Sequence, residues 1–209
     1  SLVEHLQARS SATGGPSYFQ GHLVSDSSSI NTVQADFTVS SCANSAGFSN
    51  RASIEMQIYN DGTPGTTPPN DNEPASQVGD VRAYLFLDCV AQTAQLQLLR
   101  WNSTSPLSST LLSDPANNVV PMGPLPMIGK PHTLFMKWDA TARRITFQVD
   151  GQVPVVVDPT TVNARMKVAA PYAKAPNAPA VHIGGFLGMP AANQTASMDF
   201  RVNNVFTAP

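Results

Sequence analysis

Hydrophobic and polar residues alternate with a period of two along much of the chain. The alternation is clearest in two arms, His132–Asp139 and Arg144–Asp150, on either side of the short connection DATAR. A period of two places successive side chains on opposite faces of a β-strand, so the pattern predicts a β-hairpin. Its predicted apolar face consists of Leu134, Met136, Trp138, Ile145, Phe147 and Val149.

Strand patterns recur on both sides of this hairpin, each between turn-forming residues. We expect further strands at Ser17–Ser25, Thr32–Ser40, Ala52–Asn60, Asp80–Cys89, Ala94–Trp101, 153–158, 180–188 and 197–207. Only Leu2–Ala8 and Pro159–Ala169 could hold a helical turn, and residues 1–15 are expected to be a loosely ordered N-terminal segment. The pattern predicts one all-β domain over residues 1–209, a sandwich of two antiparallel sheets.

Composition narrows the classes of function. Hydrophobic residues make up 42% of the chain, enough for a packed core, and only 12% of residues are charged. The formal net charge of −2 gives no electrostatic attraction to nucleic acids or anionic membranes. No apolar run approaches the roughly 18 residues needed to span a bilayer. We therefore expect neither a nucleic-acid partner nor a membrane span.

The chain contains two cysteines, Cys42 and Cys89, and each ends a predicted strand. Both could lie at the same rim of a sandwich and form a disulfide; the alternative is two separate thiols, with Cys89 facing the core. A disulfide and a composition poor in Lys favour an oxidising compartment. We expect a secreted, periplasmic or cell-surface location.

Three segments carry a family resemblance. HTLFMKWDATARRITFQVDGQVPVVV resembles the late strand–turn–strand of concanavalin A-like lectin/glucanase domains, including laminin G-like ones. MDFRVNNVFT is similar to their last strand, which returns beside the first, and INTVQADFTVS is similar to their second strand. The resemblance implies a jelly-roll β-sandwich and says almost nothing about activity.

In such jelly rolls one sheet is concave, and its outward side chains line the surface where glycans or substrates lie. Alternation places Ile54 and Met56 on the core side of their strand and Glu55 on the other side. We predict a ligand-binding stripe on the concave sheet, with Trp101 stacking on a sugar at its edge and Lys137 as a further polar member: Glu55, Gln57, Tyr59, Arg82, Tyr84 and Trp101. Trp138 falls on the core side and is expected to be structural.

The expected stripe lacks the motifs of related enzymes. Laminarinase-like relatives carry Glu-x-Asp-x-Glu on one strand, whereas this chain has Glu55, Gln57 and Tyr59 at the matching spacing. Alginate-lyase relatives use a Gln-Ile-His strand, which is absent here, and no nucleophile elbow or phosphate loop occurs. We therefore assign no catalytic residue. The four histidines are scattered and are expected at the surface or rim.

Calcium is the one metal that the sequence suggests. The segment Tyr59–Asp80 is rich in Asp, Asn, Pro and Gly, and Asp61 and Asp80 could supply oxygen ligands for Ca²⁺. The alternative is a solvated loop, because the same residues favour turns. By resemblance, Asp199 matches the last-strand acid that often helps to bind a structural calcium on the convex side.

Three functions remain open at this point. The first is a non-catalytic, secreted or cell-surface module that binds an oligo- or polysaccharide or acts in adhesion. The second is a glycan-active enzyme, a hydrolase or lyase with an unusual site. The third is a structural module for protein contacts.

Overall fold

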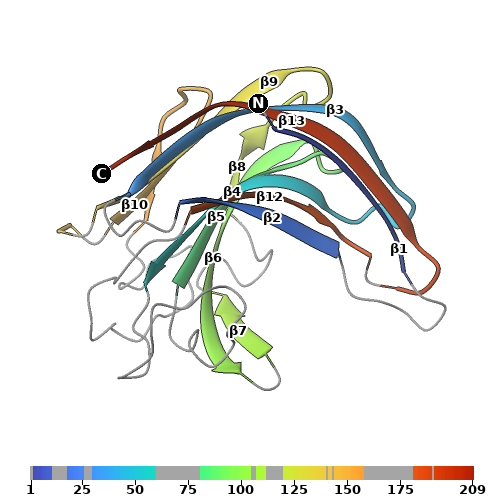
Figure 1. The fold of residues 1–209 in the computed structure, drawn as a ribbon, viewed down its shortest axis with the longest axis horizontal. Coiled ribbons are helices and arrows are strands. Elements are labelled where there is room, and N and C mark those ends of the chain that lie inside the picture. Colours follow the sequence, from blue (N-terminus) through green and yellow to red (C-terminus); the bar gives the residue numbers. More distant parts are fainter. Residues whose placement is uncertain are drawn as a thin grey trace.

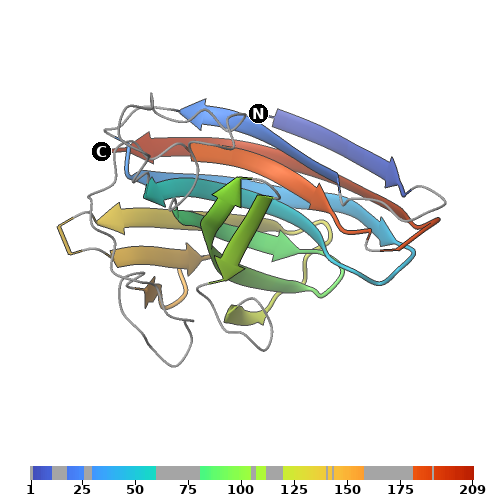
Figure 2. The same cartoon turned by 90° about the horizontal axis from the view of Figure 1, so that it is seen from below.

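The computed structural model describes residues 2–10, 18–25, 30–59, 81–104, 107–111, 120–139, 141–142, 144–157, 181–189 and 191–209. Within these ranges the chain contains β-strands and no helix, and the strands form two antiparallel sheets. Figure 1 shows one sheet arching over the other, and Figure 2 shows the strands of both layers running in similar directions. The expected jelly-roll sandwich is confirmed.

The upper layer is a six-stranded sheet, and the layer below it has seven strands. In spatial order the six strands are β1 (Leu2–Arg9), β13 (Thr195–Ala208), β3 (Thr32–Asn44), β9 (Pro131–Asp139), β10 (Arg144–Val149) and β11 (Val155–Val157). The seven are β2 (Tyr18–Ser25), β12 (Val181–Leu187), β4 (Asn50–Tyr59), β5 (Val81–Asp88), β6 (Thr93–Thr104) and β7 (Leu107–Leu111), with β8 (Val120–Pro124) also pairing with β6.

The final strand lies where the resemblance places it. β13 pairs with β1 on one side and with β3 on the other, so the last strand returns between the first two strands of its sheet. β1 itself differs from the structure expected for this part of the chain. Leu2–Arg9, part of the segment expected to be loose or helical, pairs residue by residue with Val202–Thr195 of β13. The backbone hydrogen bonds of this pairing outweigh the helix propensity of Leu, Glu, Gln and Ala.

The hairpin has the predicted register and the predicted core face. Trp138 is opposite Ile145, Met136 is opposite Phe147, and all four side chains are buried. The turn after β10 uses Asp150 and Gly151, both with positive φ (51° and 66°), the conformation that favours a DG pair. Trp138 is 1% exposed, so its structural role is confirmed.

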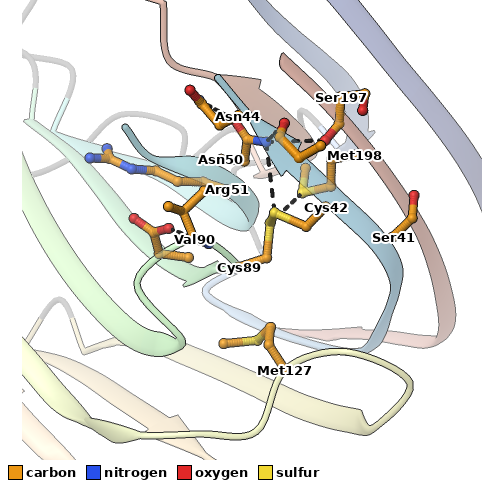
Figure 3. The surroundings of a disulfide bond; sticks show 12 residues. Ser41, Cys42, Asn44, Asn50, Arg51, Cys89, Val90, Met127, Ser197 and Met198 are labelled. Atoms are coloured by element: carbon orange, nitrogen blue, oxygen red, sulfur yellow. Dashed lines mark hydrogen bonds between the residues drawn. A yellow bond between two sulfur atoms is a disulfide. The ribbon is translucent and has the colours of Figure 1, made fainter. Parts of the chain in front are cut away.

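A disulfide joins the two sheets at one rim of the sandwich. Cys42 of β3 is bonded to Cys89, which follows β5, with their Cα atoms 6.2 Å apart. The predicted bridge is therefore confirmed. Figure 3 shows this bond beside Asn50, the first residue of β4 and fully buried. Asn50 Nδ2 donates to the carbonyl oxygens of Ala43 (2.9 Å) and Ser197 (3.1 Å), so one side chain links both sheets at this rim.

Candidate functional site

The outer face of the seven-stranded sheet carries three of the six predicted ligand-binding residues. On β4, Ala52, Ile54 and Met56 face the core and are fully buried. Ser53 and Glu55 alternate with them and therefore lie on the outer face. This face is on the inner side of the curve formed by the two layers, as Figure 1 shows. The predicted faces of Ile54, Met56 and Glu55, and the concave placement of this side of β4, agree with the structure.

One row across this face brings together residues from three strands. Glu55 of β4 is directly opposite Tyr84 of β5 on one side and His182 of β12 on the other. Arg82 lies one row further along β5, opposite Gln57. Directly opposed residues have Cβ atoms about 5 Å apart, so their side chains are immediate neighbours. Three of the predicted residues, Glu55, Arg82 and Tyr84, thus share one face.

The structure does not place the other residues of the predicted stripe on this face. The backbones of Gln57 and Tyr59 belong to β4 and that of Trp101 to β6, but all three side chains lie outside the described residues. A register shift between Gln57 and Tyr59 places Tyr59 opposite Val81, so simple alternation does not carry through to Tyr59. Lys137 is not part of this face, because β9 belongs to the six-stranded sheet.

The face is less open than a stripe of outward residues suggests. Glu55 is only 2% exposed and Phe86, two residues beyond Tyr84, only 1%. Tyr84 and Arg82 are partly exposed, so they are the more accessible of the predicted residues. Period-two alternation identifies the side of a sheet on which a residue lies, but it does not report what else covers that side.

The histidine prediction is wrong for two residues. His182 is 9% exposed and lies in the Glu55 row, and His132 is 5% exposed. Nδ1 of His132 is 2.7 Å from Asp150 Oδ2, and its Nε2 is 3.1 Å from the carbonyl oxygen of Pro126. A hydrogen-bonded site inside the hairpin end can therefore bury a histidine that the sequence pattern places at the rim. His5 is exposed, as expected.

Of the three expected calcium ligands, Asp199 alone is among the described residues. Asp61 and Asp80 lie outside the described residues. Asp199 lies on the outer face of the six-stranded sheet, where its two carboxylate oxygens contact His5 Nδ1 and accept a hydrogen bond from Ser41. These hydrogen bonds lower the pKa of Asp199, with Ser41 the larger cause. Among the described residues, no three His, Cys, Asp or Glu side chains gather in a way that could hold a metal ion.

Arg51 is the residue that sequence reasoning missed. It precedes the apolar alternation of β4 and lies opposite Phe186 of β12 and Asp88 of β5. Its guanidinium carbon lies 4.2 Å from the ring centroid of Phe86 and 5.2 Å from that of Phe186. The arginine is thus placed on the same outer face as Tyr84 by two aromatic rings from neighbouring strands.

Comparison with known proteins gives a likeness of fold only. No family model and no curated protein matches the chain. The κ-carrageenase of Pseudoalteromonas carrageenovora is 12% identical over 90% of this chain and 68% of its own, with a TM-score of 0.43. Lectin II from Ulex europaeus is 11% identical over 97% of this chain and 93% of its own, with a TM-score of 0.39. The CBM40 of the Ruminococcus gnavus IT-sialidase, bound to α2,3 sialyllactose, is 13% identical over 98% of this chain and 93% of its own, with a TM-score of 0.37.

Proposed function

We propose that this chain is a non-catalytic carbohydrate-binding β-sandwich module with its ligand on the outer face of the seven-stranded sheet. The supporting observation is the row in which Glu55 lies between Tyr84 and His182, with Arg82 beside it. Sugars are bound by aromatic rings that stack on their C–H faces and by polar side chains that bond their hydroxyls. Tyr84 supplies a ring, and Arg82 and Glu55 supply a donor and an acceptor.

The remaining predicted residues complete this proposal. Gln57 and Tyr59 continue β4 beyond Glu55, and Trp101 lies in β6 on the far side of β5. We propose that they extend the same surface, with Trp101 at its edge. Open sheet faces bury little ligand area, so an affinity of about 10–1,000 μM is expected, or roughly −4 to −7 kcal/mol.

Glycan-array screening followed by calorimetric titration tests the proposal. The wild-type protein should bind at least one oligosaccharide, and Tyr84→Ala should weaken that binding about tenfold or more, because it removes the stacking ring. Lys137→Ala is the matched control, since this exposed lysine lies on the other sheet and should leave binding unchanged. Absence of binding to any glycan, or an unchanged affinity in Tyr84→Ala, would remove this face as the site.

Location and metal content belong to the same proposal. We propose a secreted, periplasmic or cell-surface protein, because the Cys42–Cys89 bond is of the kind that persists in oxidising compartments. No helix among the described residues is long and apolar enough to cross a membrane. A structural Ca²⁺ held by Asp61, Asp80 or Asp199 stays a prediction, and a rise in melting temperature on adding Ca²⁺ to chelator-treated protein would support it.

A glycan-active enzyme is the second candidate function. It is favoured by one observation: Glu55 is 2% exposed and lies in register between His182 and Tyr84. Buried titratable groups next to one another are the setting in which acid–base residues occur. Release of reducing ends or unsaturated uronates from a bound glycan, abolished in Glu55→Gln, would establish this candidate. Binding without turnover supports the module instead.

A further inference from the structure

Arg51 is held in place by two aromatic rings and one hydroxyl group. The rings of Phe86 and Phe186 come from the strands on either side of β4, and each lies within reach of a cation–π contact with the guanidinium. Nε donates to Ser49 Oγ at 2.5 Å. The plane and direction of the guanidinium are therefore fixed before any ligand arrives.

Both carboxylate oxygens of the neighbouring Asp88 accept hydrogen bonds from groups other than Arg51. Asp88 Oδ2 accepts a hydrogen bond from Ser49 Oγ at 2.5 Å, and Oδ1 accepts from the backbone amides of Val90 (3.0 Å) and Ala91 (3.1 Å). Arg51 and Asp88 are thus joined through Ser49. In the described part of the chain, Nε is the guanidinium nitrogen that has an acceptor, and the two terminal nitrogens have none.

The surroundings of Arg51 make these two nitrogens suited to an anion. Burial lowers the pKa of Arg51, and electrostatic interaction, chiefly with Asp88, acts in the opposite direction. Arginine nevertheless stays protonated in proteins. A partly desolvated guanidinium whose two terminal nitrogens have no acceptor among the described residues presents parallel N–H donors. Such donors match the two oxygens of a carboxylate or sulfate group.

We infer that Arg51 is the recognition point for an acidic group, a carboxylate or a sulfate ester, on the glycan bound by this face. The inference rests on the proposed function and adds the ligand class, an acidic oligosaccharide. Phe186 is partly exposed beside the guanidinium, so its ring can contact the apolar face of the sugar that carries the anion. Along β4, Arg51 lies four residues, or about 14 Å, from Glu55, which leaves neighbouring sugar units to contact Tyr84 and Arg82.

The alternative is that Arg51 only braces the sheet. In that case its loss lowers stability and leaves ligand preference unchanged. The two roles are separable because selectivity between an acidic and a matched neutral sugar is independent of the amount of folded protein. The preference expected for an acidic ligand is about tenfold, equivalent to about 1.4 kcal/mol, since Asp88 offsets part of the positive charge.

The test uses matched pairs of oligosaccharides. Tetragalacturonate is compared with its methyl ester, and a sulfated galactotetraose with its desulfated form; the two pairs distinguish a carboxylate from a sulfate ligand. The wild type should bind the acidic member of one pair about tenfold more tightly, and added salt should reduce the difference. Arg51→Gln should abolish the preference while binding of the neutral form persists. Arg201→Gln, an exposed arginine on the other sheet, should keep the preference.

Arg51→Lys covers the case in which Arg51→Gln does not fold. Lysine keeps the charge but lacks the fork of donors, so most of the preference should be lost in a folded protein. NMR detection of the Arg51 Nε–H, with glucuronate and galactose 6-sulfate as probes, gives an independent readout: the signal should shift with an acidic sugar and stay in place with galactose. Equal binding of acidic and neutral forms, or a preference retained in both Arg51 variants, overturns the inference and leaves the carbohydrate module standing. Absence of binding to every glycan overturns both.

Discussion

The outer faces of the two sheets carry similar polar residues in different environments. On the six-stranded sheet, His5, Asp199 and Ser41 form one row across β1, β13 and β3, and the His5 and Asp199 side chains are 68% and 37% exposed. On the seven-stranded sheet, His182, Glu55 and Tyr84 form a row across β12, β4 and β5. In this row Glu55 is only 2% exposed and His182 only 9%.

The difference lies in what surrounds each face, since both strands alternate in the same way. Charged side chains on the first face remain hydrated, so their interactions are weak and depend on salt. Polar groups on the second face have lost water and must be satisfied by protein or ligand atoms. This contrast is the physical reason for placing the candidate glycan site on the seven-stranded sheet and not on the six-stranded one.

The largest expected loss of stability comes from removing a fully buried aromatic ring. Phe147 of β10 is 0% exposed and faces the shared core, so Phe147→Ala should lower the free energy of unfolding by about 3–5 kcal/mol. Gln148, the next residue, faces outward, and Gln148→Ala should cost about 0.5 kcal/mol or less. Urea denaturation of both variants checks the pair. Equal costs would contradict the assignment of faces in the hairpin.

Loss of the bond between the sheets should have a similar effect. The Cys42–Cys89 bond spans a sequence separation of 47 residues, and in the chain-entropy model its removal costs about 3–4 kcal/mol. The double variant Cys42→Ala/Cys89→Ala should therefore melt at a much lower denaturant concentration, close to that of the reduced wild type. Thiol titration of the unreduced, denatured wild type should find no free thiol; two thiols would contradict the bond.

Phe86→Ala tests whether the outer face of the seven-stranded sheet behaves like a core. Phe86 is 1% exposed although it faces away from the sandwich interior, so its truncation should cost about 2–4 kcal/mol, including the lost contact with Arg51. Val3, on the outer face of the six-stranded sheet, is 64% exposed, and Val3→Ala should cost about 0.5 kcal/mol or less. Thermal or denaturant unfolding of the two variants compares the faces directly. A cost for Phe86→Ala as small as that for Val3→Ala would refute the covered character of this face.

The smallest effect concerns acid stability. Hydrogen bonds from Ser41 and His5 lower the pKa of Asp199 below its ordinary value of 3.8. The ionised Asp199 carboxylate therefore stabilises the fold above that ordinary value, and the contribution is lost as pH falls through the lowered pKa. Asp199→Asn should cost under about 1 kcal/mol at pH 7, and the difference from wild type should shrink as pH falls below about 4. A difference that grows on acidification would show the opposite sign of coupling.

The periodic part of the chain was predictable because its signal is local. The hairpin register, the core side of β4 and β5 and the DG turn all follow from alternation and from turn chemistry within a few residues. The predictions that were wrong concern residues whose conformation or burial depends on strands far away in the sequence. β1 was expected to be loose or helical, and it is a strand because β13 offers it eight paired residues. His182 was expected at the rim, and it is buried in a strand that has β2 on one side and β4 on the other.

The sequence by itself determined an all-β sandwich, the core side of β4, β5 and the β9–β10 hairpin, and a pair of cysteines placed to form a bridge. These features are predictable because periodicity and turn residues act over short distances. Only the tertiary structure decided which strands are neighbours. That choice put Lys137 on the opposite sheet from Tyr84. It also placed Arg51 against Phe86 and Phe186, residues that lie 35 and 135 positions away along the chain. Contacts between strands depend on sheet order, and sheet order is set by the packing of the whole sandwich.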